Sequence, residues 1–167
     1  MMHRRKPVIL SWDPPNAVAL VQGDTLLMHD HWTMAKKSDL WLSSRVNEIL
    51  QVSIPQVLDG SIDVLVVEGQ YLHVFGDDAP HVKRGKQRGS LVLSYRAGII
   101  AGICMVATGL ECTRLDPDKW QTAMVGRGGR EQRKKMSLLR ARSMTGIELT
   151  VDESDAYLMG AYQGSII

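Results

Sequence analysis

The chain has 167 residues, of which 44% are hydrophobic, and this length suits one domain, 1–167, without requiring a second. Its net charge is only +2, yet residues 119–142 hold eight Lys and Arg against one acid, which favours a polyanionic partner. The two cysteines have no metal-type spacing and no secretory signal is seen, so we expect reduced thiols. The longest uncharged stretch, 97–110, is too short to span a bilayer, so we expect no membrane partner.

Residues 8 to 67 predict an antiparallel meander, a helix and a fourth strand. In chain order the elements are strands Val8–Asp13, Ala17–Gln22 and Thr25–His29, a helix from Ser38-Asp39 to about Leu58, and strand Ile62–Val67. Gly23-Asp24 is a good two-residue hairpin turn, and Pro55 is expected to shorten or kink the end of the helix. The nearly continuous apolar run of the fourth strand is typical of a central, parallel position buried on both faces.

Residues 73 to 163 predict a polar loop, several helices and one more strand. The elements are a loop over 73–89, a helix at Ser90–Gly109, a strand at Glu111–Leu115, and helices from Pro117, over Arg130–Met144 and over 152–163. The first of these helices is rich in Ala and Gly, which permits close packing against the sheet or a second subunit. The expected fold is therefore α/β, with a mixed five-stranded sheet (three antiparallel strands, then two parallel) flanked by helices.

Acidic residues stand at three points of this pattern. Asp13 ends the first strand, Glu68 ends the fourth, and Asp152 and Asp155 open the last helix. Two carboxylates about 4 Å apart repel by ~4 kcal/mol at an effective dielectric near 20, so a converging ionised set needs cations. Carboxylate oxygens are the ligands that Mg²⁺ and Mn²⁺ prefer. These four acids are our candidate catalytic and metal-binding residues, and they point to metal-dependent phosphoryl transfer.

Each acid also has a structural explanation. Asp13 could cap the Pro14-Pro15 turn, and Glu68 could be an exposed residue at a strand end. Asp152 could be the N-cap of the last helix with Asp155 as an acid at N3. Glu153, between them, is expected to point away into solvent.

The chain resembles the ribonuclease-H-like nucleases, and most closely the RuvC-type Holliday-junction resolvases. The similarity covers nearly the whole chain and depends on the order and spacing of short motifs. These are Ser11-Trp12-Asp13-Pro14, Val66-Val67-Glu68-Gly69-Gln70-Tyr71, Arg96-Ala97-Gly98, Gly126-Arg127-Gly128 and Asp152-Glu153-Ser154-Asp155-Ala156. The chain departs from the family at Pro15, where the family has glycine, and at Gln132, where the family has a lysine; Lys119 is shifted in register from another family lysine.

The resemblance implies a homodimeric endonuclease that nicks a four-way DNA junction at two symmetric positions, leaving 5′-phosphate and 3′-hydroxyl ends. It also implies that Asp13, Glu68, Asp152 and Asp155 hold two Mg²⁺ or Mn²⁺ ions. We expect a cytoplasmic protein of a bacterial cell or of a virus-infected host cell. Alternatives are a related nuclease that acts on flaps, forks or RNA–DNA hybrids, and a non-catalytic junction-binding protein.

Basic and aromatic residues are the candidates for DNA contact. They are Tyr71, Arg84, Lys86, Lys119, Arg127, Arg130, Arg133 and Lys134. Tyr71 would stack on a base, although a core position is an alternative, and the basic residues could equally form ordinary solvated faces. The Gly126–Gly129 turn lacks the Lys-Ser/Thr ending of a P-loop, so no nucleotide cofactor is expected. His29-Asp30-His31 is expected in a loop, without a third zinc ligand.

Overall fold

The computed structural model describes residues 5–69 and 80–167 and shows the predicted five-stranded mixed sheet. The strands are β1 (Val8–Asp13), β2 (Ala17–Gln22), β3 (Thr25–His31), β4 (Val64–Glu68) and β5 (Cys112–Leu115), in the spatial order β3-β2-β1-β4-β5. The β1–β2 and β2–β3 pairs are antiparallel, whereas β4 runs parallel to both β1 and β5. The predicted fold class is therefore confirmed.

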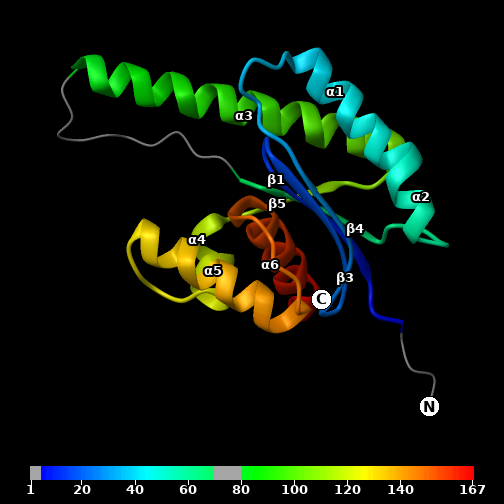
Figure 1. The fold of residues 1–167 in the computed structure, drawn as a ribbon. Helices are drawn as coiled ribbons and strands as arrows, with labels where there is room; N and C mark the ends of the chain where they lie inside the picture. Colours follow the sequence, from blue (N-terminus) through cyan, green and yellow to red (C-terminus); the bar gives the residue numbers. More distant parts are fainter. Residues whose placement is uncertain (1–4, 70–79) are drawn as a thin grey trace.

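Helices cover both faces of the sheet, as Figure 1 shows. On one face lie α1 (Asp39–Glu48), the π-helical turn η1 (Ile49–Ser53), α2 (Ile54–Val57) and the long helix α3 (Pro80–Thr108). On the other face lie α4 (Pro117–Met124), α5 (Arg130–Thr145) and α6 (Val151–Ile166). This two-sided cover explains why β1, β2 and β4 are apolar along almost their whole length.

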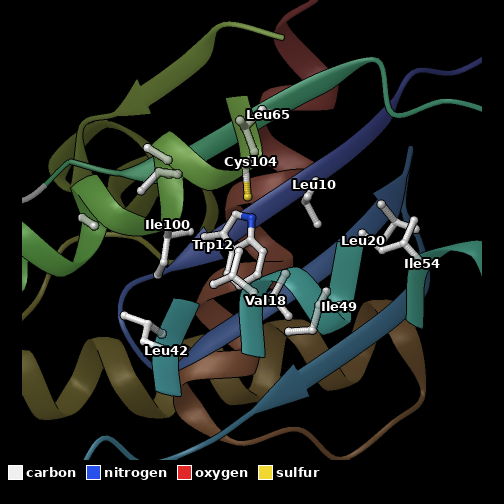
Figure 2. Close-up of a cluster of buried hydrophobic side chains, with 14 of the residues drawn as sticks. Leu10, Trp12, Val18, Leu20, Leu42, Ile49, Ile54, Leu65, Ile100 and Cys104 are labelled. Atoms are coloured by element: carbon white, nitrogen blue, oxygen red, sulfur yellow. The ribbon is translucent and has the colours of Figure 1, made fainter. Parts of the chain in front are cut away.

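Alternate residues of the strands supply two separate cores, because successive side chains of a strand point to opposite faces. Trp12 of β1 lies at the centre of the first core, among side chains of α1, η1 and α3 such as Ile49, Ile100 and Cys104 (Figure 2). Ile9 of β1, Val21 of β2 and Val66 of β4 face the second core, which also contains Trp120 of α4 and Tyr157 of α6.

Two predictions about local structure are wrong. Residues 80–89, expected in a polar loop, form the first turns of α3, because Lys, Arg and Gln are good helix formers even where no apolar periodicity marks the helix. Asp30 and His31, also expected in a loop, lie in β3, which extends beyond the predicted strand end at His29. The two cysteines are free, as expected.

One helix within the described ranges is long and apolar enough to cross a membrane by length and composition alone. It is the Arg88–Thr108 part of α3, whose most apolar window has a mean hydropathy of 1.7 and is only 22% buried against the rest of the chain. The expectation of no membrane partner therefore remains a prediction.

Candidate active site

The sheet places Asp13 and Glu68 side by side. Trp12 of β1 pairs with Val67 of β4 in a parallel register, so the next residue of each strand reaches the same edge of the sheet. A turn follows Asp13, whose carbonyl accepts a hydrogen bond from Asn16 N at 3.0 Å. The apolar run of each strand thus ends in a half-buried carboxylate at one common edge.

The first turns of α6 bring the other two acids to the same edge. Thr150 is the N-cap of α6, and its side chain and that of Glu153 form a reciprocal capping box. Asp152 and Asp155 therefore lie inside the helix, three residues apart on one face. The interpretation of Asp152 as the N-cap is wrong, and the Thr-x-x-Glu signature of 150–153 was the signal that could have corrected it.

Glu153 is buried, in contrast to the expectation that it points into solvent. The residue is 5% exposed, and one carboxylate oxygen lies 2.6 Å from His29 Nδ1 and 3.4 Å from His31 Nδ1. Burial alone would raise the pKa of Glu153, but hydrogen bonds from Thr150 and His29 prevail and lower it to about 2. This contact ties the edge strand β3 to the helix that carries Asp152 and Asp155.

The four candidate acids interact electrostatically. The pKa of Asp13 is raised well above its ordinary value, first by burial and then by the negative charges of Glu68, Asp155 and Asp152. Burial is also the main reason why the pKa of Asp155 is raised to about 6; Asp152 adds to this effect, while a hydrogen bond from Ser137 and the charge of Lys134 oppose it. The structure thus brings together the acids that the sequence placed on three separate elements.

A pocket of about 430 Å³ opens beside these acids. Glu68, Asp152 and Asp155 line one part of it, and Arg130, Arg133 and Lys134 of α5 line another. Asp116 and Asp118, at the start of α4, also line it and were not among the predicted site residues. Acidic and basic groups therefore line one space, which can take a phosphate group of a polyanion.

The other predicted DNA-binding residues are placed differently. Lys119 and Arg127 are exposed but do not line this pocket. The backbone of Arg84 and Lys86 lies in α3 rather than in a loop. Tyr71 is outside the described residues.

Two buried residues support the acids, and sequence reasoning missed both roles. Trp120 Nε1 donates a hydrogen bond to Glu68 Oε1 at 3.1 Å, and Ser137 Oγ donates one to Asp155 Oδ1. These partners are separated from the acids by 52 and 18 residues along the chain. No local pattern connects a helix tryptophan to a strand-end glutamate, so only the packing of α4 reveals this contact.

The donor set fits a hard divalent cation. It consists of carboxylate oxygens, and burial together with the neighbouring negative charges raises the pKa values of Asp13 and Asp155, so a bound cation would favour their ionised forms. As placed, however, no three His, Cys, Asp or Glu side chains in 5–69 and 80–167 form a group tight enough to hold a metal ion. Side-chain rotation would have to bring the oxygens of Asp13, Glu68, Asp152 and Asp155 closer around a cation.

Comparison with known proteins identifies the fold. No protein-family model matches the sequence, and no curated protein matches it significantly. Among solved structures, the chain is similar to Thermus thermophilus RuvC in complex with a Holliday junction substrate, with a TM-score of 0.60, 17% identity and coverage of 96% of both chains. A second Thermus thermophilus RuvC structure gives a TM-score of 0.57 and 16% identity over 95% of this chain and 96% of that one. Over nearly its whole length the chain therefore has the ribonuclease-H-like fold of RuvC.

Proposed function

We propose that this chain is a divalent-metal-dependent endonuclease that resolves four-way DNA junctions by symmetric nicking. The observation that carries the proposal is the convergence of Asp13, Glu68, Asp152 and Asp155, from three elements of a RuvC fold, beside a pocket lined by basic residues. A protein that only binds DNA gains nothing from clustered negative charge facing a phosphate. The acids therefore favour an enzyme over a junction-binding protein.

The chemistry follows from the charges of the pocket. Asp13, Glu68, Asp152 and Asp155 would hold two Mg²⁺ or Mn²⁺ ions, which supply charge stabilisation and an activated water for in-line displacement at phosphorus. The products would be 5′-phosphate and 3′-hydroxyl ends. Asp155 is held by Ser137, and Glu68 by Trp120, so the protein restricts the acids before any cation arrives.

Helix α5 provides the positive side of the pocket. Arg133 donates a hydrogen bond to Gln121 Oε1 at 2.7 Å, which holds its guanidinium at the pocket wall. Lys134 is close enough to Asp155 to lower the pKa of that acid. These two side chains and Arg130 are placed to bind the phosphate backbone of DNA and bring the scissile phosphate to the acids.

The exposed side of α3 supports a homodimer. Leu91, Tyr95 and Val106 are 55%, 61% and 88% exposed, and they follow helical spacing along one side of the helix. Gly98 and Gly102 lie on the same side, with no atom within 4 Å of an added Cβ. A second copy packed on this surface would bury it and give two active sites related by two-fold symmetry, which matches a junction cut twice. We further propose that the protein acts in the cytoplasm, where bacterial or viral DNA is recombined.

A junction assay tests the proposal. A synthetic four-way junction is incubated with the protein and Mg²⁺ or Mn²⁺, and a gel resolves symmetrically nicked duplexes. We expect nicks for the parent protein and none for Asp13→Asn or Glu68→Gln, whereas Asp59→Asn, an exposed acid before β4, should cut normally. Equal cutting by the parent and Asp13→Asn would refute the assignment of these acids as the active site.

The same assay separates the alternative functions. Faster cutting of a flap, fork or RNA–DNA hybrid at equal salt would keep the chemistry and change the substrate. Tight junction binding without nicks in either cation would show a non-catalytic junction-binding protein.

A further inference from the structure

Trp120 makes an unusual contact for a core residue. It is fully buried in the second core, where α4 packs beside α6. Its single polar atom, Nε1, donates to Oε1 of Glu68 across 3.1 Å. By contrast, the buried Trp32 Nε1 has no hydrogen-bond partner within residues 5–69 and 80–167.

The chemistry of the indole suits the orientation of a metal-binding carboxylate. An indole N–H only donates, so it always favours the acceptor form of the glutamate. The ring is fully buried in the second core, so the packing of its neighbours fixes the position of its N–H. A carboxylate has about four lone-pair sites, so accepting one N–H leaves acceptor capacity for a cation.

The position of the contact connects it to the pocket. Glu68 lines the pocket, and so do Pro117, Asp118 and Gln121 of α4, the helix that carries Trp120. Gly69 N, the next residue after Glu68, donates to Leu115 O at 2.7 Å, so the backbone on that side is fixed as well. The side chain of Glu68 is thus held from α4 while its backbone is held by β5.

We infer that Trp120 is a positioning residue that orients Glu68 to bind the divalent cation. This inference rests on the proposed function, because it assumes that Glu68 is a metal ligand. It adds that α4, which contributes none of the four candidate acids, sets the metal affinity of the site. Outer partners of metal ligands typically change metal affinity by about 10–100-fold when they are removed.

The test is a Mn²⁺ titration by calorimetry, with MnCl₂ alone and no DNA. We expect Trp120→Phe, which keeps an aromatic ring and removes the N–H, to weaken Mn²⁺ binding by about tenfold or more. Trp32→Phe is the matched control, because the Trp32 N–H has no partner in the described part of the chain, and this variant should bind Mn²⁺ as the parent does. In a Glu68→Gln background, Trp120→Phe should cause no further loss, because position 68 then no longer supplies a charged ligand for Trp120 to orient.

The outcomes separate this inference from the proposed function. If the parent binds Mn²⁺ and Glu68→Gln weakens that binding, but Trp120→Phe does not, the positioning role is wrong and the metal site stands. An equal loss from Trp120→Phe in the parent and Glu68→Gln backgrounds would mean general loosening of the core and would also overturn it. If the parent binds no Mn²⁺, both proposals fail. Should Trp120→Phe not fold, benzothienylalanine at position 120 keeps the ring volume, replaces the N–H with sulfur, and must show the same loss.

Discussion

Replacing Asp155 with Asn should stabilise the metal-free protein while abolishing cleavage. The pKa of Asp155 is raised from 3.8 to about 6, chiefly by burial, so the folded protein resists ionisation of this group. Asn has nearly the same shape and can still accept the hydrogen bond from Ser137 Oγ. The substitution therefore removes the charge and keeps the packing.

The magnitude follows from the pKa difference between the folded and unfolded states. At 1.36 kcal/mol for each pKa unit, a rise from 3.8 to about 6 corresponds to about 3 kcal/mol of destabilisation once the group is ionised. An acid whose pKa is raised in the folded state lowers the free energy of unfolding by the full amount at pH values above that pKa. The loss disappears as the pH falls toward the pKa of the unfolded chain. The gain of Asp155→Asn should thus be largest near pH 8 and small near pH 4.

Thermal or urea unfolding of both proteins in EDTA at pH 8, 6 and 4 measures this effect. For a chain of this size, about 3 kcal/mol corresponds to several degrees in Tm. In saturating Mn²⁺ the order should reverse, because only the parent gains the full binding free energy of the cation. A gain that is the same at pH 8 and pH 4, or a variant less stable than the parent at pH 8, would refute the electrostatic explanation.

Three further predictions concern packing, assembly and DNA binding. A Cβ added at Gly160 would lie 2.8 Å from Val21 Cγ2, so Gly160→Ala should lower the free energy of unfolding by about 1–3 kcal/mol. Urea titration measures this loss, and an unchanged free energy of unfolding would mean that α6 can move away from the sheet. Val106→Glu, on the exposed side of α3, should give a monomer in sedimentation velocity, and an unchanged mass would exclude that surface as the interface. Neutralising Arg133 or Lys134 should weaken junction binding. It should also reduce the slope of the logarithm of the DNA-binding constant against the logarithm of salt concentration by about one per lost phosphate contact. An unchanged slope would mean that these residues do not contact DNA.

The strands and the four acids could be predicted because local sequence determines them. The runs 8–12 and 64–67 are apolar at nearly every position, on both faces of the strand, which is typical of a central strand between two helical layers. Parallel pairing then brings Asp13 and Glu68 to one edge whatever the details of packing. The start of α3 escaped prediction because its first turns are polar and basic, without the apolar periodicity that marks a helix.

The surroundings of the acids depended on the tertiary structure. The contact of Trp120 with Glu68, that of Ser137 with Asp155, and that of His29 with Glu153 each join residues on different elements, up to 124 positions apart. Whether such side chains meet depends on how α4, α5 and α6 cross the sheet, and ridge-and-groove packing over the whole surface sets those angles. Sequence alone thus determined that Asp13 and Glu68 end two apolar strands, whereas the packing of α6 brought Asp152 and Asp155 to the same edge. Only the packed helices decided how each carboxylate is held, because hydrogen bonds depend on positions to within a fraction of an ångström.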